Sequence, residues 1–170
     1  MAKCNFAPAA PDEEIIHGAC RPGHQLMTSS ANPVDVWIES MRSHDIERVC
    51  CLLNEKLLHY DDLLELYRRE FGPQRVCHAP IADYEVVSID TFQNDILPFL
   101  TSADAQSEPV VVHCSAGMGR TGHVLALWLA CKREYTLQEA VQEVKNSGRN
   151  PLEAASPDDL EEIYSAVCSD

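Results

Sequence analysis

The sequence has few lysines and no long apolar run. Lysine occurs only at positions 3, 56, 132 and 145, and the 13 Lys and Arg residues are set against 27 Asp and Glu, for a formal net charge of −14. Affinity for nucleic acid depends on clustered Lys and Arg, which this chain lacks, so the charge excludes a nucleic-acid partner. No stretch approaches the roughly 18 consecutive apolar residues that cross a bilayer, so we expect no membrane association.

The opening MAKCNFAPAAPDEE has no apolar segment after its lysine, as a secretory leader would have. We therefore expect a soluble, non-secreted, cytoplasmic protein. The acidic balance resembles that of proteins from salt-rich cytoplasms, but an ordinary acidic cytosolic protein fits it equally well.

Eight cysteines are scattered from Cys4 to Cys168 in a chain large enough to be stable without disulfides. We expect them to be reduced thiols. No Cys-x-x-Cys pair occurs, and Cys50 and Cys51 would point to opposite faces of a strand, so we expect no zinc site.

The length of 170 residues and a hydrophobic content of 45% fit one compact domain. Residues 1–13 carry Ala, Pro and acids without periodicity and are interpreted as an N-terminal tail. Residues 14–170 would then form a single catalytic domain.

Apolar runs alternate with amphipathic stretches, which predicts an α/β fold with a central, mainly parallel sheet flanked by helices. The expected strands are Ile15–Ala19, Val49–Leu53, Arg75–Ile81 and Pro109–His113. Helices are expected after Asn32, over Asp61–Phe71, around Phe92 where Pro98 bends or shortens the helix, over Thr121–Cys131, after Thr136 with its Glu139 capping box, and after Ser156.

The segment VVVHCSAGMGRTGHVLALWLA reads as a strand, a seven-residue loop from Cys114 to Arg120, and a buried helix. A loop between a strand and a helix N-terminus can turn its N–H groups inward around an anion. Gly117 and Gly119 permit the backbone angles this needs. Ser115, Ala116 and Met118 complete a phosphate-sized cradle, in which Arg120 can bind two phosphoryl oxygens at once.

Cys114 begins this loop, and we expect the amides, the helix dipole and the guanidinium to keep its thiol ionised as a nucleophile at neutral pH. Thr121 can donate its hydroxyl to the sulfur. His113 is interpreted as a buried residue that fixes the loop through hydrogen bonds and not as a general base. The competing interpretation makes Cys114 a core cysteine and the glycines a simple turn; the combined spacing of Cys, Gly and Arg argues against it.

The pattern His113-Cys114-x-x-Gly117-x-x-Arg120-Thr121-Gly122 resembles the signature of the protein tyrosine phosphatase superfamily, and the size of the chain is similar to its compact dual-specificity branch, including archaeal members. The resemblance implies a phosphatase that forms a thiophosphoryl (phosphocysteine) intermediate, uses no metal or other cofactor, and carries an aspartic acid on a separate loop to protonate the leaving oxygen.

In this branch the general acid lies about thirty residues before the cysteine. Asp83 lies 31 residues before Cys114 and directly follows a predicted strand. Asp90 and Asp95 are rivals, but they fall in or beside a predicted helix, where a solvated or capping role is the default. The resemblance therefore implies Asp83 as the acid.

Two departures from the family bear on the substrate. The Trp-Pro-Asp and Asn-Arg-Tyr-type motifs of the larger tyrosine-specific enzymes are missing, and the loop positions Ser115, Ala116 and Met118 lack the lysines found in inositol-lipid phosphatases. We expect a phosphoprotein substrate that carries phosphotyrosine. Whether phosphoserine and phosphothreonine are also substrates is left open by the sequence. The alternatives are a catalytically weak phosphate-binding module and a rhodanese-like sulfurtransferase, whose loop cysteine usually lies in a shorter loop.

Overall fold

The computed structural model describes residues 3–24, 32–54 and 60–168. Its centre is a five-stranded sheet in the order β1-β2-β5-β3-β4. The strands are β1 (Ala7–Pro8), β2 (Ile16–Ala19), β3 (Arg48–Cys51), β4 (Val76–His78) and β5 (Val110–His113). The helices are α1 (Pro33–Ser43), α2 (Leu63–Phe71), α3 (Ile89–Thr91), α4 (Leu97–Gln106), α5 (Gly119–Lys132), α6 (Leu137–Asn146) and α7 (Pro157–Val167).

The sheet is mainly parallel, as the strand-helix alternation predicts. Strands β2, β5, β3 and β4 run parallel, and only β1 is antiparallel to its neighbour β2. β5 occupies the centre and is buried along its whole length. His113 at its carboxyl end is in register with Ala19 of β2 and Cys51 of β3. The chain segment that follows β5 therefore emerges at the middle of this edge of the sheet.

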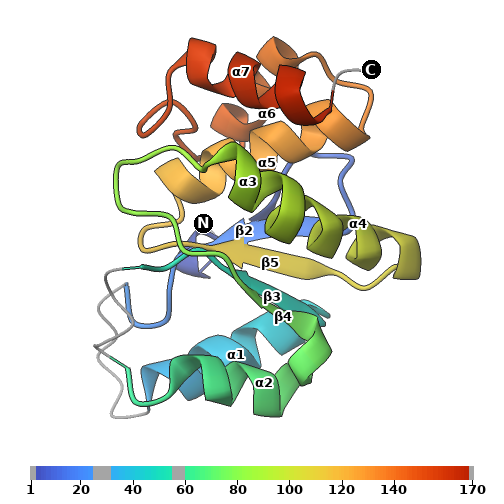
Figure 1. Ribbon diagram of the computed structural model, residues 1–170. Helices are drawn as coiled ribbons and strands as arrows, with labels where there is room; N and C mark the ends of the chain where they lie inside the picture. The colour runs from blue at the N-terminus through green and yellow to red at the C-terminus, as the bar shows by residue number, and fades with distance from the viewer. Residues whose placement is uncertain (1–2, 25–31, 55–59, 169–170) are drawn as a thin grey trace.

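Helices cover both faces of the sheet (Figure 1). The helices α1 and α2 pack on one face, around a core that includes Trp37 and Tyr67, and the remaining helices pack on the other, around Phe92 and Trp128. Cys50 belongs to one core and Cys51 to the other, as strand alternation predicts. No helix among the described residues is both long enough and apolar enough to span a membrane.

The predicted helix signals are confirmed at α1, α6 and α7. Asn32 caps α1, whose first turn contains Pro33. Thr136 and Glu139 form the predicted capping box of α6, and Ser156 forms a second capping box with Asp159 at α7. α5 is buried on nearly all sides, which explains why its sequence is apolar without periodicity.

The helix predicted around Phe92 is longer than expected and does not break at Pro98. α3 continues through a π-helical segment, Phe92–Ile96, into α4, where Pro98 lies in the first turn. The wider π turn accommodates a residue that cannot donate a backbone hydrogen bond. The sequence does not reveal this, because a proline inside a helical pattern normally indicates a helix end.

The interpretation of residues 1–13 as a tail is wrong for the described residues 3–13. Ala7 and Pro8 pair with β2, and the Glu13 side chain is buried. Glu13 accepts hydrogen bonds from Trp128 Nε1 at 2.6 Å and Arg133 Nη2 at 3.0 Å. The segment is held by single contacts to distant parts of the chain, which leave no periodic pattern in the sequence.

The expectation of eight reduced thiols is also wrong. Disulfides join Cys4 to Cys20 and Cys131 to Cys168, while Cys50, Cys51, Cys77 and Cys114 are free. Sequence spacing alone does not reveal such pairings because each depends on tertiary proximity. The cytoplasmic location rested partly on reduced cysteines and stays a prediction without that support.

Replacing the buried Glu13 by alanine should destabilise the fold. The change leaves Trp128 Nε1 without its acceptor and removes one of the two carboxylates bound by Arg133, so we expect a loss of about 2–3 kcal/mol in the free energy of unfolding. Urea unfolding measures this. The matched control is Glu14→Ala, because Glu14 is exposed, and it should change stability by less than about 0.5 kcal/mol. Equal effects of the two substitutions would contradict the buried network.

Candidate active site

A pocket of about 230 Å³ opens where β5 ends and α5 begins. Three of the predicted catalytic residues, Cys114, Arg120 and Asp83, line it together. The remaining lining residues are His24, Tyr84, Ser115, Ala116, Met118, Gly119, Glu153 and Ala154. The structure thus brings the predicted nucleophile, cation and acid to one cavity.

The two carbonyl groups at the start of the loop are held from outside it. Cys114 O is 3.0 Å from Nδ1 of His113, and Ser115 O accepts from the backbone N–H of Arg21 at 2.9 Å. Arg21 Nε also donates to Ser115 Oγ at 3.1 Å. In a trans peptide the C=O and N–H point in opposite directions. Anchoring these oxygens outward therefore directs the N–H groups of Ser115 and Ala116 toward the inner side of the loop.

Gly117 is held in the same way. Its carbonyl accepts from Arg149 Nη1 at 2.6 Å and from Asn5 Nδ2 at 3.2 Å, which directs the N–H of Met118 inward. Gly117 has φ +75°, and a Cβ there would lie 2.6 Å from Ala19 O. Glycine is therefore required at this position for two reasons, conformation and space.

Arg120 is almost completely buried, and its guanidinium is fixed on one side by the protein. Nη1 donates to Ile81 O at 2.8 Å, and Nη2 lies 3.3 Å from Asp83 Oδ1. The Arg120 side chain is 2% exposed, whereas that of Asp83 is 47% exposed. The cation is thus preorganised at the base of the pocket, and the carboxylate stands at its solvent side.

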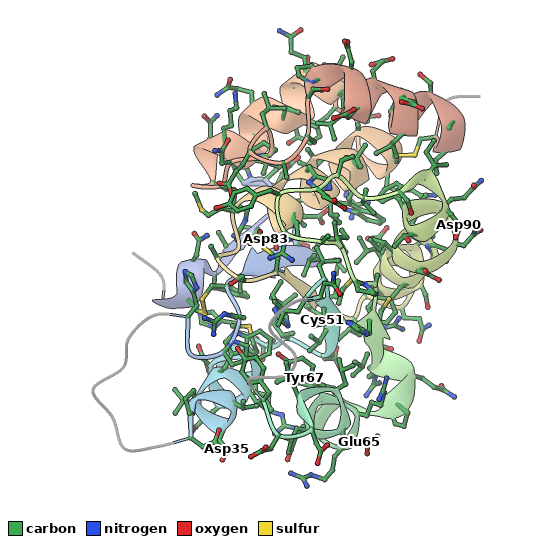
Figure 2. The ribbon with its side chains drawn as sticks, turned by 60° about the vertical axis from the view of Figure 1, so that its left-hand side comes forward. Asp35, Cys51, Glu65, Tyr67, Asp83 and Asp90 are labelled. Carbon is green, nitrogen blue, oxygen red and sulfur yellow. A yellow bond between two sulfur atoms is a disulfide. The ribbon has the colours of Figure 1, made fainter. Side chains whose placement is uncertain are left out.

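Of the three candidate acids, only Asp83 lines this pocket. Figure 2 shows Asp83 near the middle of the molecule and Asp90 on α3, away from it. Asp90 accepts from Asn94 Nδ2 at 2.8 Å in the helix, and Asp95 belongs to the π-helical segment. The geometry favours Asp83 over both rivals.

Two buried histidines flank the loop. Nδ1 of His113 bonds to Cys114 O, and its Nε2 lies 3.0 Å from Tyr67 Oη. Nδ1 of His123 bonds to Gly119 O at 3.0 Å, while its Nε2 accepts from the Val87 N–H at 3.1 Å. Both rings therefore act as donors at Nδ1 and acceptors at Nε2, the arrangement of a neutral imidazole. This matches the fixing role predicted for His113.

Burial sets the charge of these histidines. It lowers the pKa of His113 to about 4, against a partial increase from the bond to Cys114 O. It lowers the pKa of His123 to about 4 in the same way. The positive charge of Arg120 also lowers both values. At neutral pH both rings are therefore uncharged, and each uses its Nδ1 proton in a hydrogen bond to a carbonyl oxygen.

Thr121 does not make its predicted hydrogen bond. Its Oγ1 is buried and has no hydrogen-bond partner among the described residues. The residue lies in the first turn of α5, directly after Arg120. The expected bond to the Cys114 sulfur is therefore not formed here, and a role for the hydroxyl in catalysis stays a prediction.

Several residues of the site have no counterpart in the sequence prediction. Arg149 is buried beneath the loop and contacts only carbonyl oxygens among the described residues, those of Gly117, Asn5 and Ala7. Burial lowers the pKa of Arg149 to about 10. Glu153, on the segment before α7, adds a carboxylate to the pocket lining. No local motif marks these positions, because each reaches the loop from a distant segment.

A family model described as "Tc-R-P: Polymorphic toxin system, DSP-PTPase phosphatase" matches residues 23–134, a range that includes Asp83 and the whole loop. This chain belongs to that family. It is thus a member of the dual-specificity branch of the protein tyrosine phosphatase superfamily, a group of hydrolases, as the sequence signature indicated.

Individual relatives agree with this assignment. The dual specificity protein phosphatase OPG106 of Vaccinia virus (strain Western Reserve) is 34% identical over 62 residues, which cover 36% of this chain and 36% of the viral protein. The Monkeypox virus protein of the same name is 34% identical over 59 residues. The matched segments span about a third of these curated relatives.

Solved structures share the fold of this protein over nearly the whole chain. Tk-PTP in its active form has a TM-score of 0.69 at 22% identity, covering 94% of this chain and 96% of Tk-PTP. PTPMT1 in complex with PI(5)P has a TM-score of 0.71 at 12% identity and covers 95% of each chain. At these identities the likeness concerns the fold alone.

Stability should fall as the pH drops from about 6.5 to about 4, because the unfolded chain then protonates His113 and His123 while the folded chain does not. Between about pH 7 and about pH 5 we expect each histidine to contribute a loss on the order of 2 kcal/mol. Urea unfolding of His123→Gln across this range should show a shallower dependence than the parent. An unchanged pH dependence in His123→Gln would contradict the buried neutral histidines.

Proposed function

We propose that this phosphatase-family member is a cysteine-dependent protein phosphatase that hydrolyses phosphotyrosine, and also phosphoserine and phosphothreonine, through a phosphocysteine intermediate. The observation that carries the proposal is that Cys114, Arg120 and Asp83 line one pocket. The anchored carbonyls of the loop support it, because they direct the amides that follow them inward. Neither alternative from the sequence is favoured by a specific feature. A binding module needs no acid beside the cradle, and a sulfurtransferase needs no Arg120 at the loop end.

In the first chemical step, the Cys114 thiolate attacks phosphorus, and the bond from phosphorus to the substrate oxygen breaks. The inward-directed amides and Arg120 hold the three nonbridging oxygens, where negative charge is concentrated in the transition state. Asp83 gives its proton to the leaving oxygen. The products of this step are the dephosphorylated alcohol or phenol and phosphocysteine.

In the second step, water attacks the phosphorus of phosphocysteine. Asp83, now a carboxylate, accepts a proton from this water, and the sulfur of Cys114 leaves as the thiolate. The reaction releases inorganic phosphate and restores the starting enzyme. His113 and His123 take no part in proton transfer in this scheme, because both hold the loop in their neutral form.

The rim of the pocket supports an aromatic phosphoester among the substrates. Tyr84 lies directly after Asp83, lines the pocket and is 70% exposed. An exposed aromatic ring at the rim can pack against the ring of phosphotyrosine. Among the loop side chains Ser115, Ala116 and Met118 none is basic, which disfavours a polyphosphorylated inositol headgroup with several negative charges.

The test is turnover of an aryl phosphate and of phosphopeptides by single-residue variants. Cys114→Ser should abolish turnover while keeping phosphate binding, because a serine hydroxyl is far less acidic than a thiol. Asp83→Asn should slow esters with poor leaving groups by about 10²–10⁴-fold and activated aryl esters much less. Asp90→Asn is the matched control and should keep the parent rates. Substantial turnover by Cys114→Ser, or a leaving-group effect in Asp90→Asn and not in Asp83→Asn, would overturn the assignment.

A further inference from the structure

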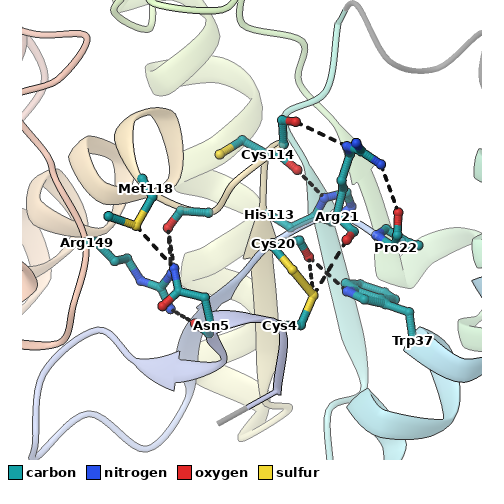
Figure 3. Close-up of a disulfide and its surroundings, with 12 residues drawn as sticks. Cys4, Asn5, Cys20, Arg21, Pro22, Trp37, His113, Cys114, Met118 and Arg149 are labelled. Atoms are coloured by element: carbon teal, nitrogen blue, oxygen red, sulfur yellow. Dashed lines mark hydrogen bonds between the residues drawn. A yellow bond between two sulfur atoms is a disulfide. The ribbon is translucent and has the colours of Figure 1, made fainter. Parts of the chain in front are cut away.

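The N-terminal segment contacts the outer side of the phosphate-binding loop. Asn5 Nδ2 donates to Gly117 O at 3.2 Å and lies 3.4 Å from Met118 Sδ (Figure 3). The backbone oxygen of Asn5 accepts from Arg149 Nη2 at 2.8 Å, while Arg149 Nη1 donates to the same Gly117 oxygen. Asn5 therefore reaches the loop both directly and through the guanidinium of Arg149.

This contact uses an unfavourable backbone conformation. Cys4 has φ 60° and Asn5 has φ 57°, so two consecutive residues other than glycine adopt the left-handed region. Single residues of this kind are uncommon, and they persist where the surrounding structure holds them. Something must therefore keep residues 4 and 5 in place against the loop.

The Cys4–Cys20 disulfide provides this restraint. It joins the residue before Asn5 to the residue directly after β2, and the Cys20 N–H donates to Cys4 O at 2.8 Å. Cys20 is in turn anchored in the core, because its carbonyl accepts from Trp37 Nε1 at 2.9 Å. The following residue, Arg21, holds Ser115 O of the loop. The disulfide thus links the segment of Asn5, which holds Gly117 O, to the segment of Arg21, which holds Ser115 O.

We propose that Asn5 is a positioning residue for the phosphate-binding loop, and that the Cys4–Cys20 disulfide holds it there, so that breaking this disulfide weakens phosphate binding. Asn5 acts through Gly117: a fixed Gly117 carbonyl keeps the Met118 N–H aimed at the phosphate. This inference rests on the proposed function in one respect, which is that the loop binds phosphate.

The chemical step is reduction of the disulfide by a dithiol. The dithiol is oxidised to its own disulfide and supplies two electrons and two protons, which convert the Cys4 and Cys20 sulfurs to thiols. The same reagent keeps Cys114 reduced. A loss of activity on reduction therefore cannot come from oxidation of the nucleophile.

The second disulfide offers a matched control. Cys131 lies near the end of α5 and Cys168 directly follows α7, so this bond lies at the opposite end of α5 from the loop. The double variant Cys131→Ser/Cys168→Ser should bind phosphate like the parent. It also leaves Cys4–Cys20 as the only disulfide among the described residues for a dithiol to reduce.

The experiment measures the Kd of inorganic phosphate by calorimetry in this double variant, before and after treatment with dithiothreitol. We expect reduction to raise the Kd about two- to tenfold, as for the loss of one hydrogen bond, and reoxidation to reverse the change. Asn5→Ala in the same background should raise the Kd similarly and should make it less sensitive to reduction, because only the backbone contact of residue 5 with Arg149 then remains to be lost. In each case, kcat/KM for an aryl phosphate should fall by about the same factor by which the Kd of phosphate rises.

A smaller effect of reduction in the Asn5→Ala protein than in its parent is the readout that a merely structural disulfide would not give. An unchanged Kd after reduction would overturn the proposal, and so would equal further weakening by reduction in the Asn5→Ala variant. Circular dichroism verifies that each protein is folded at the measuring temperature. Binding of phosphate can also be measured in Cys114→Ser, so failure of the phosphatase assignment is distinguishable from failure of this one.

Discussion

The constraint on which the site depends is the orientation of the peptide groups between Cys114 and Arg120. A loop that binds phosphate through its backbone must turn N–H groups inward, and each outward carbonyl then needs a donor elsewhere. The donors come from four separate segments, through His113, Arg21, Asn5 and Arg149. The segments that surround the loop therefore place a hydrogen-bond donor next to each of these outward-facing carbonyl oxygens.

The groups that hold the loop also determine the charge around the pocket. Arg120 and Arg149 are both buried, and the two histidines that flank the loop stay neutral. Arg120 is paired with Asp83 at the solvent side of the pocket, whereas Arg149 donates hydrogen bonds only to carbonyl oxygens among the described residues. Burying a cation is costly, and in the proposed reaction a phosphoryl dianion would offset part of this cost. A bound phosphate would therefore supply the negative charge that balances these buried cations. Without phosphate, the surrounding fold keeps the cavity open. This favours binding of phosphate in a protein whose overall charge opposes it.

The sequence predicted the parts of the molecule that rest on local patterns. Strand β5, the loop and helix α5 follow from one continuous segment, and the capping box of α6 and the start of α7 at Ser156 follow from adjacent residues. Asp83 could be ranked above Asp90 from its spacing to Cys114, which the family resemblance implies, and because it follows a predicted strand. The disulfides, the buried Glu13 and the role of Arg149 could not be predicted, since each depends on residues that are distant in sequence.

The prediction of an N-terminal tail failed for the same reason. Residues 3–13 form no periodic pattern, yet Asn5 contacts the loop and Glu13 enters the core. The single bond from Asn5 to Gly117 spans 112 residues of sequence. Composition alone makes such a segment look unstructured, and only its tertiary contacts show its place in the site.

The central claim is that Cys114 carries the phosphoryl group during turnover. The most direct measurement is rapid denaturation of the Asp83→Asn protein during reaction with a radiolabelled activated aryl phosphate, followed by peptide mapping. The account predicts stoichiometric label on the peptide that contains Cys114 and no label in the Cys114→Ser protein. Continued turnover with no label on Cys114, or label on another residue, would contradict it.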